Sequence, residues 1–313
     1  MIVNNINKDQ LVSVIMNCHN GEKYISEAID SVLSQTYNNW ELVVWDNKST
    51  DNTRDIVNSY SDHRIKYYCS DEFNALGEAR NLAIKKSKGD FIGFLDADDL
   101  WMPDKLKMQV PAFNDEKIGI CISDSYFFNE TGVIKQIYKK KKPPTGMVFK
   151  ELLGRYFISM ETAMIRRSSL DTLNEWFDPR FNMIEEYDLF VRIGYKWEVE
   201  YIDKVLAMWR FHKDSWTWTR SQNFPIERQD MLKKLENVIP EFNDKYRNEI
   251  YLVNRTCDFE NARIFWADNN NRDARLLLRP YAYSGLKWYV AYIMTYLPYI
   301  YFKKLWNQIG GIA

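Results

Sequence analysis

Short apolar runs and amphipathic segments alternate along the first 124 residues of the chain. The apolar runs, each typical of a β-strand, lie at 11–17, 41–47, 64–69, 90–96 and 118–123. After the first run, one helical face collects Ile25, Ala28, Ile29, Val32 and Leu33. A second helix is predicted over 74–86. Because parallel strands need crossover connections, this alternation predicts a doubly wound α/β unit with a mostly parallel sheet.

The alternation ends after residue 124. Four lysines and two prolines at 139–144 predict an exposed loop between two ribbon-like segments. Helices are expected over 149–156 and from Glu185 onward, where acidic side chains lie at the positive end of a helix dipole. A longer pattern, helical and charged, covers 226–278.

The charge and cysteine content narrow the class of protein. The chain carries 42 Lys and Arg against 43 Asp and Glu, which argues against nucleic acid as the main partner because phosphate binding needs a basic face. Four cysteines form no CxxC pair and no zinc-like spacing with the three histidines. The apolar run at 11–16 is too short for a secretion signal. We therefore expect a cytoplasmic protein.

Aromatic residues make up 15% of the chain, and a dense group of them lies near its C-terminal end. Residues 288–302 are fifteen residues without a charge, rich in Tyr and bracketed by Lys287 and by Lys303 and Lys304. A bilayer-spanning helix needs about 20 such residues. The segment therefore predicts peripheral contact with the inner face of the cell membrane through 286–306. A helix packed on the preceding α/β part of the chain, or across a homodimer, is the alternative.

Acidic residues leave two of the predicted strands. The second strand ends at Asp46 and Asn47, and the fourth runs into Asp96-Ala97-Asp98-Asp99. Ligands of open α/β sheets bind at the carboxyl ends of the strands, and carboxylates after apolar strands need a positive partner. Oxygen ligands of this kind predict Mg2+ or Mn2+ and a nucleotide-diphosphate substrate. Alternatively, Asp98 and Asp99 cap the turn into the next helix.

Four motifs in this order resemble the nucleotide-binding half of the family 2 glycosyltransferases. They are Ser13–Gly21 (SVIMNCHNG), the acidic turn 46–51, Gly77–Asn81 (GEARN) and Asp96–Asp99 (DADD). The resemblance covers about 10–220 and implies a GT-A fold, Rossmann-like, with a helical C-terminal extension. It implies a catalytic domain over 1–224, with halves at 10–124 and 125–224, and a helical region over 225–313.

The resemblance assigns roles around the nucleotide. Asp46 would accept the imide N–H of uracil or thymine, which implies a UDP- or dTDP-sugar. Arg80 would contact the nucleotide, unless it forms a salt bridge on the helix surface. Asp98 would bind the metal, and Asp96 the ribose, or the metal through water. The implied nucleotide-binding set is Asn17, His19, Asn20, Asp46, Asn47, Arg80, Asp96 and Ala97.

The first motif departs from the family pattern. Members usually carry proline and tyrosine at the positions of Asn17 and His19. His19 would stack on the base or point a ring nitrogen at it, or else serve as a local hydrogen-bonding residue.

The segment 185–192 resembles the acidic motif that supplies the catalytic base of inverting members. Glu186 matches the usual aspartate, and Glu185 is the competitor for the role. Asp188 would orient the loop or contact the acceptor. The alternative is that these acids only stabilise a helix N-terminus.

A later segment, 209–215, resembles the one that closes over the diphosphate. His212 would bind the metal or phosphate, and Arg210 or Lys213 would offset the charge of the leaving group. Trp216 and Trp218 would form a wall for the acceptor sugar, or pack under a loop.

Together these features predict an inverting, metal-dependent hexosyl- or N-acetylhexosaminyltransferase of the bacterial surface-polysaccharide type. It would use Mn2+ or Mg2+ and move a sugar from a UDP- or dTDP-sugar to a saccharide or lipid-linked saccharide. A catalytically silent sugar-nucleotide- or glycan-binding subunit is the alternative. A nucleotidyltransferase would need a Gly-rich basic loop, and Asn20-Gly21-Glu22-Lys23 is a poor match.

Overall fold

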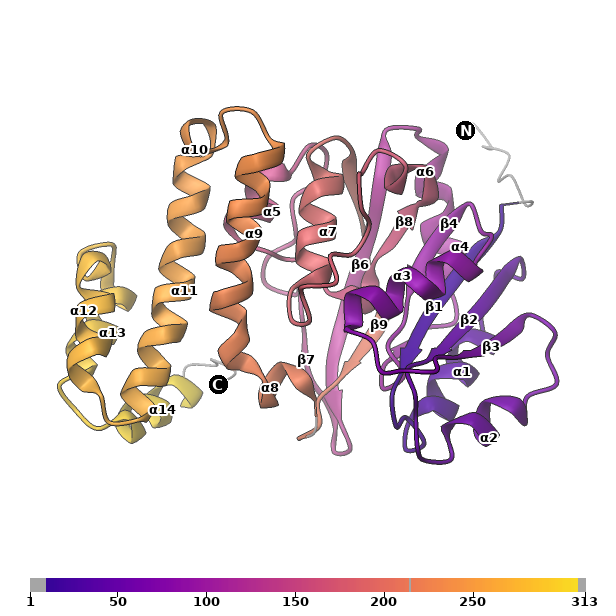
Figure 1. The fold of residues 1–313 in the computed structure, drawn as a ribbon, viewed down its shortest axis with the longest axis horizontal. Helices are drawn as coiled ribbons and strands as arrows, with labels where there is room; N and C mark the ends of the chain where they lie inside the picture. Colours follow the sequence, from indigo (N-terminus) through magenta and orange to yellow (C-terminus); the bar gives the residue numbers. More distant parts are fainter. Residues whose placement is uncertain (1–9, 214, 309–313) are drawn as a thin grey trace. The chain divides into compact units, whose positions relative to one another are not determined.

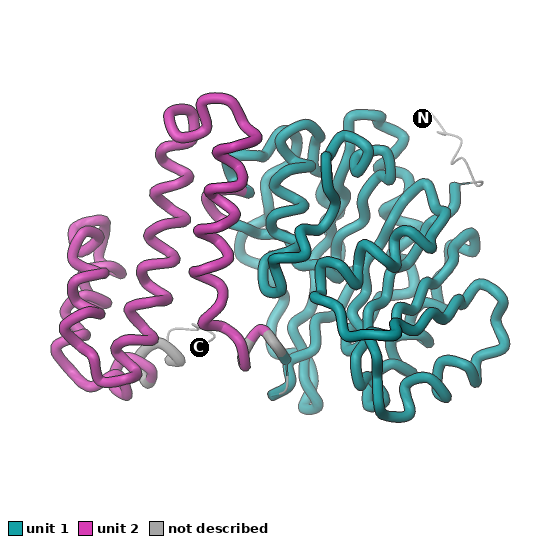
Figure 2. Tube along the Cα trace, in the orientation of Figure 1, with its two compact units in different colours: residues 1–152, 156–215 teal, residues 153–155, 216–313 magenta. Residues whose placement is uncertain are grey.

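The computed structural model describes residues 10–213 and 215–308, and the side chains of all of these except 216, 218 and 304–308. The chain forms two compact units, unit 1 (1–152 and 156–215) and unit 2 (153–155 and 216–313) (Figure 2). The sequence predicts a boundary at 224–225, whereas the division falls at 215–216, because the short helix after it groups with the later helices.

In the described part of unit 1, nine strands form one mixed sheet in the order β3-β2-β1-β4-β8-β6-β9-β5, with β7 beside β6 (Figure 1). The strands are β1 (Val12–Cys18), β2 (Trp40–Asp46), β3 (Ile65–Cys69), β4 (Phe91–Phe94), β5 (Leu100–Trp101), β6 (Ile118–Asn129), β7 (Gly132–Gln136), β8 (Met164–Arg166) and β9 (Glu198–Arg210). The helices are α1 (Ile25–Leu33), α2 (Thr53–Asn58), α3 (Leu76–Lys86), α4 (Lys105–Gln109), α5 (Phe149–Gly154), α6 (Arg167–Leu170) and α7 (Glu185–Gly194).

The first four strands in sequence form the parallel half that the alternation predicts. β1 and β2 are buried at every position, as expected for parallel strands covered on both faces. One face packs against α1 and α2, where Ile29 and Val32 join Val14 and Met16 in the core, and α3 packs on the other face. In register, Cys18 lies opposite Asp46, so the polar segments after β1 and β2 meet at one edge.

The second half of the sheet is mixed. β8 pairs antiparallel with β4 and β6, and β9 runs parallel to β6. β5 pairs antiparallel with β9, with Leu100 opposite Met208. The acidic run that precedes β5 therefore lies beside the C-terminal end of β9, although the two are far apart in sequence.

In its described residues, unit 2 is helical. Its helices are α8 (Trp216–Thr219), α9 (Phe224–Val238), α10 (Phe242–Lys245), α11 (Arg247–Ala267), α12 (Asn271–Leu278), α13 (Leu286–Met294) and α14 (Tyr299–Gln308). The uncharged segment 288–302 forms parts of two helices, because Pro298 lacks the N–H that a continuous helix needs. Trp266 donates from its indole to the carbonyl of Leu297 at 2.8 Å and fixes this break. None of the helices in the described part of the chain is long and apolar enough to span a bilayer.

Candidate active site

Asp46 ends β2 and is held inside the protein. Its side chain is 1% exposed, and its oxygens accept from the Ser49 N–H at 2.7 Å and from the Tyr67 hydroxyl at 2.6 Å. Burial, and then the hydrogen bond to Asp46 and the charge of that carboxylate, raise the pKa of Tyr67, so this phenol stays a donor. The contact of Asp46 with a base N–H stays a prediction, and such a contact would compete with Tyr67.

The loops after β1 and β2 form one block. The Asn20 side-chain oxygen accepts from the Thr50 N–H at 2.8 Å, and the Asn20 N–H donates to the Ser49 hydroxyl at 2.9 Å. The His19 Nδ1 lies 2.9 Å from the Asn47 carbonyl oxygen. The exposed His19 ring meets Phe73 edge-on, with ring centroids 4.9 Å apart. These two rings offer an open aromatic corner at the edge of the sheet.

Two further predicted residues line this block. Asn17 is 8% exposed at the end of β1, and among the described residues neither its amide nitrogen nor its amide oxygen has a hydrogen-bond partner. Buried polar groups are normally satisfied, so this amide fits a polar group brought by a ligand. Ala97 lies close by, since a Cβ on Gly21 would be 3.7 Å from the Ala97 Cβ.

Arg80 joins two acidic segments. From α3 its guanidinium donates to Asp96 at 2.9 Å and to Glu185, 105 residues later in the chain. It is 4% exposed, so a salt bridge on the helix surface is the wrong description. Burial alone would lower the pKa of Arg80, but the carboxylates of Asp96 and Glu185 raise it above its usual value. The positive charge is therefore permanent and holds the acidic run after β4 beside the start of α7.

The two glutamates at the start of α7 differ. Glu185 is 2% exposed and is paired with Arg80, whereas Glu186 is half-buried. Burial, and then the charge of Glu185, raise the pKa of Glu186 well above its ordinary value, although Arg80 opposes the shift. Glu186 is therefore a stronger base than an ordinary exposed carboxylate, as a group that accepts a proton should be.

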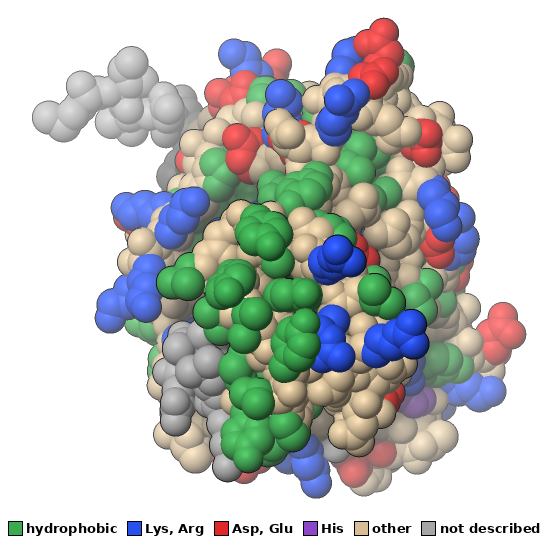
Figure 3. All heavy atoms as spheres, turned by 90° about the vertical axis from the view of Figure 1, so that its left-hand side faces the viewer, with side chains coloured by type: hydrophobic (Ala, Val, Ile, Leu, Met, Phe, Trp, Pro, Cys, Tyr) green, Lys and Arg blue, Asp and Glu red, His purple; other side chains and the backbone are tan. Residues whose placement is uncertain are grey.

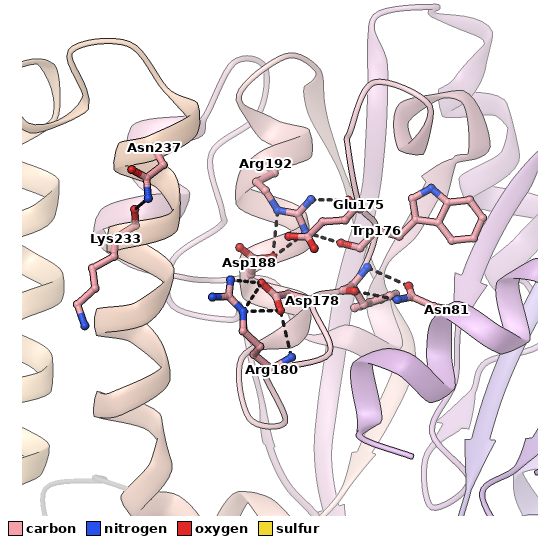
Figure 4. Close-up of polar contacts among 10 residues, drawn as sticks. Asn81, Glu175, Trp176, Asp178, Arg180, Asp188, Arg192, Lys233 and Asn237 are labelled. Atoms are coloured by element: carbon pink, nitrogen blue, oxygen red, sulfur yellow. Dashed lines mark hydrogen bonds and ion pairs between the residues drawn. The ribbon is translucent and has the colours of Figure 1, made fainter. Parts of the chain in front are cut away.

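Asp188 lies on the inner side of α7 and anchors a loop (Figure 4). Its carboxylate accepts from Arg192 at 2.6 Å and 3.0 Å, and Arg192 also donates to the carbonyl oxygens of Glu175 and Trp176. The same loop is tied to α3, because the Asn81 amide donates to the Phe177 carbonyl at 2.8 Å and accepts from the Phe177 N–H at 3.0 Å. These contacts fix α3 and α7 around Arg80.

Asp98 meets His212 at the end of β9. The His212 Nε2 lies 2.7 Å from a carboxylate oxygen of Asp98, although 114 residues separate them. Asp99, the expected helix cap, is buried and accepts from the Arg210 N–H at 2.8 Å instead. The first residue of the next helix, Lys105, follows Asp104, so neither Asp98 nor Asp99 caps it.

Arg210 links the acidic run 96–99 to helix α1. Its guanidinium donates to the Asp98 carbonyl at 2.7 Å and to Glu27 at 2.8 Å, and it lies over the Tyr24 ring at 4.5 Å. Lys213 is exposed. Trp216 and Trp218 belong to α8, but their side chains lie outside the described residues.

The donor set fits a magnesium or manganese ion. Within the described residues, no three His, Cys, Asp or Glu side chains form a complete metal centre. Asp98 and His212 supply one hard oxygen and one imidazole, and Mg2+ and Mn2+ are commonly held by one or two protein groups with substrate phosphates. A nucleotide diphosphate would provide the missing ligands.

Sequence reasoning missed three neighbours of the site: Tyr67, Phe73 and Glu27. Tyr67 and Phe73 belong to β3 and the segment that follows it, a part of the chain that contains none of the four motifs of the resemblance. Their position at the same edge as Asp46 was the available signal. Glu27 lies on α1 and reaches Arg210 across 183 residues, a pairing for which the sequence contains no local sign.

The mixed, mostly parallel sheet followed by a helical region is a fold of the GT-A type, and comparison with known proteins gives the family. The model of the family described as "Glycosyl transferase family 2" matches residues 13–173, more than half of the chain. The chain therefore belongs to glycosyl transferase family 2. The family, the fold and the enzyme class predicted from the sequence are confirmed.

Individual relatives match this chain in sequence or in fold. The UDP-Glc:alpha-D-GlcNAc-diphosphoundecaprenol beta-1,3-glucosyltransferase WfgD of Escherichia coli is 36% identical over 185 residues, which cover 59% of this chain and 70% of that protein. Among solved structures, S. aureus TarS 1–349 in complex with UDP-GlcNAc has a TM-score of 0.66 at 22% identity, over 87% of this chain and 80% of that one. The mannosyltransferase PcManGT from Pyrobaculum calidifontis, in complex with GDP-Man and Mn2+, has a TM-score of 0.61 at 18% identity, over 96% and 84%.

Proposed function

We propose that this chain is an inverting, metal-dependent hexosyltransferase that moves a sugar from a UDP-sugar, or less readily a dTDP-sugar, to a lipid-linked saccharide. The observation that carries the proposal is the Arg80 bridge, which joins Asp96 to Glu185 and so brings the acidic run after β4 beside the half-buried Glu186. Direct displacement requires stabilisation of the leaving diphosphate and a base for the acceptor hydroxyl. The acidic run would meet the first requirement by holding a cation, and Glu186 would meet the second.

Glu186 is the proposed base. Its raised pKa lets it take the proton of the acceptor hydroxyl as the new glycosidic bond forms, while Glu185 holds Arg80 in place. Attack by the acceptor on the face opposite the leaving nucleotide inverts the anomeric centre. This assignment favours Glu186 over Glu185, because a base already paired with a buried arginine is less able to accept a proton.

Asp98 and His212 would hold the divalent cation, which would neutralise the charge of the departing diphosphate when bound. Lys213, exposed next to His212 in sequence, is available to the diphosphate, whereas the guanidinium of Arg210 is already bound by Asp98 and Glu27. Asn17 and the His19–Phe73 corner are the proposed contacts for the base and ribose.

The donor and acceptor classes rest on relatives. The E. coli relative is named for UDP-Glc and a GlcNAc-diphosphoundecaprenol acceptor, and S. aureus TarS was solved with UDP-GlcNAc. PcManGT was solved with GDP-Man, so this fold alone does not select uracil. We therefore propose a UDP-hexose donor and an acceptor whose first sugar is attached to a lipid diphosphate, which brings the reaction to the membrane surface.

The test uses the full chain with a panel of UDP- and dTDP-sugars and a synthetic GlcNAc-diphosphate lipid, with Mn2+, with Mg2+ or with a chelator. We expect acceptor-dependent nucleotide release that needs the metal, and a product of inverted configuration. Glu186→Gln should lower kcat by about a hundredfold or more with UDP affinity unchanged, since the base is lost. Glu116→Gln, an exposed site, is the matched control.

Three outcomes would contradict parts of the proposal. Full activity in Glu186→Gln, with loss in a stably folded Glu185→Gln, would move the base to Glu185. Metal-dependent turnover that survives Asp98→Ala would remove the metal role of Asp98. Binding of UDP-sugars without transfer to any acceptor would favour the silent binding subunit.

A further inference from the structure

The outer side of α13 is apolar although its inner side is already packed. Leu286, Tyr289 and Ile293 recur at helical spacing and are 79%, 48% and 42% exposed. On the inner side, Ala291 belongs to the hydrophobic core of unit 2 and Trp288 packs against it. An ordinary surface helix is apolar on the core side only, so this helix has a second apolar side that the folded unit does not use.

The same surface continues past the helix. Tyr296, Leu297 and Ile300 are 61%, 46% and 52% exposed around the break at Pro298. We call the surface formed by Leu286, Tyr289, Ile293, Tyr296, Leu297 and Ile300 the outer face. Figure 3 looks onto this side of the molecule and shows hydrophobic side chains gathered over it, with Lys and Arg beside them. A contiguous apolar surface of this kind marks an interaction site.

The stretch of chain that carries the outer face has charged residues of one sign only. Residues 274–308 contain five basic residues, Arg275, Arg279, Lys287, Lys303 and Lys304, and no Asp or Glu. Arg279, Lys287 and Lys303 are exposed. Burial, and then the positive charges of Arg155 and Arg255, lower the pKa of Lys287, which is the sign of cations crowded together. The surface is therefore both apolar and positively charged.

This combination favours a membrane, rather than a second copy of the chain, as the partner of the outer face. A twofold dimer through the outer face would bring two identical sets of these cations together without an acid among them, and like charges oppose such contact. An anionic bilayer instead offers phosphate to the lysines and a half-wet zone to the tyrosines, whose rings are apolar and whose hydroxyls are polar. Because α13 has nine residues, fewer than half of the about 20 that cross a bilayer, the contact would lie in the headgroup region.

We propose that the outer face docks on the surface of an anionic lipid bilayer, with α13 lying in the interface and Arg279, Lys287 and Lys303 on lipid phosphates. The inference rests on the proposed function in one respect, since a lipid-linked acceptor is what such docking would serve. Its physical basis is the outer face itself, so binding to lipid can be tested without any sugar transfer.

The experiment is flotation of the full chain with vesicles of phosphatidylcholine alone or with 30 mol% phosphatidylglycerol, an amount chosen as about that of an anionic membrane. We expect binding to the anionic vesicles that falls as NaCl rises, because surface charge is screened. The variant Leu286→Glu with Ile293→Glu should lower the vesicle partition coefficient at least about tenfold, since two apolar contacts are replaced by charges that the anionic surface repels.

Matched variants separate the apolar contribution to vesicle binding from the electrostatic one. Ile226→Glu changes another exposed apolar residue of unit 2, 62% exposed on α9, and should bind as the unaltered chain does. Lys287→Ala with Lys303→Ala should weaken binding and its salt dependence, whereas Lys245→Ala with Arg247→Ala, also exposed, should not.

The proposal is overturned if the chain stays unbound on anionic vesicles, or if the outer-face and control variants bind equally. It is also overturned if the unaltered chain is a dimer in sedimentation and Leu286→Glu with Ile293→Glu makes it a monomer without affecting lipid binding, because the face would then belong to a second copy. Nucleotide release measured in water with a soluble acceptor reports on the proposed function separately.

Discussion

At the scale of one residue, Lys105 is an ionisable side chain buried in the core of unit 1. Its side chain is fully buried on α4, where the ammonium donates to the Gln109 side-chain oxygen at 2.5 Å and to the Thr162 carbonyl at 2.8 Å. Burial lowers its pKa from 10.5 to about 7, and the neighbouring Cys121 and Glu161 oppose this shift only partly. The amine is therefore poised between its two protonation states at neutral pH.

A dependence of stability on pH follows. Between about 7 and 10.5 the unfolded chain binds a proton at Lys105 that the folded chain has released, so the free energy of unfolding should rise with pH in this window. The slope has an upper limit of about 1.4 kcal/mol per pH unit. Lys105→Met should remove this part of the slope in urea unfolding at pH 7, 8 and 9. Lys107→Met, exposed on the same helix, is the control, and equal slopes for all three proteins would contradict the expectation.

At the scale of a secondary-structure element, α3 is held by the loop that precedes α7. Asn81 pairs through both amide atoms with the backbone of Phe177, and a Cβ on Gly77 would lie only 2.7 Å from the Asp178 carbonyl oxygen. The close approach positions Arg80, one residue before Asn81, for its two carboxylates. The loop therefore acts on the site through the helix.

Removal of the Asn81 amide tests this link. Asn81→Ala leaves the buried N–H and carbonyl of Phe177 without their partners, which should cost about 1–3 kcal/mol of unfolding free energy. Because Arg80 would lose its fixed position, kcat should fall as well, with faster hydrogen exchange at the Phe177 amide. Lys85→Ala, exposed on the same helix, should change none of these. A destabilised Asn81→Ala with unchanged kcat and exchange would show that the pair has only a local role.

These pairings mark the limit of prediction from the sequence. The apolar runs correctly indicated β1 to β4 and the start of β6, because strand periodicity is local. The antiparallel strand β8 has only three residues and no such signal. The family pattern implies Asp98 as a metal ligand and His212 as a ligand of the metal or of phosphate, but their 2.7 Å separation depends on the β5–β9 pairing. The burial of Lys105 is decided by tertiary packing alone.

At the scale of the whole molecule, the two units carry different chemistry. Unit 1 contains the acidic run 96–99, Arg80 and the α7 glutamates, and unit 2 contains the outer face with its cations. The near-zero net charge of the chain, 42 basic against 43 acidic residues, conceals this separation. An acidic site for a metal-bound nucleotide and a basic, apolar surface for a bilayer suit an enzyme whose donor is dissolved and whose acceptor is anchored.

This division predicts that the outer face affects turnover only when the acceptor lies in a membrane. With a GlcNAc-diphosphate lipid in anionic vesicles, Leu286→Glu with Ile293→Glu should raise the apparent KM for the acceptor about tenfold, because fewer enzyme molecules occupy the surface. With the same lipid dispersed in detergent, kcat and KM should match those of the unaltered chain and of Ile226→Glu. An equal loss in detergent would mean that the outer face supports folding or chemistry instead, since a docking surface has no role once the bilayer is gone.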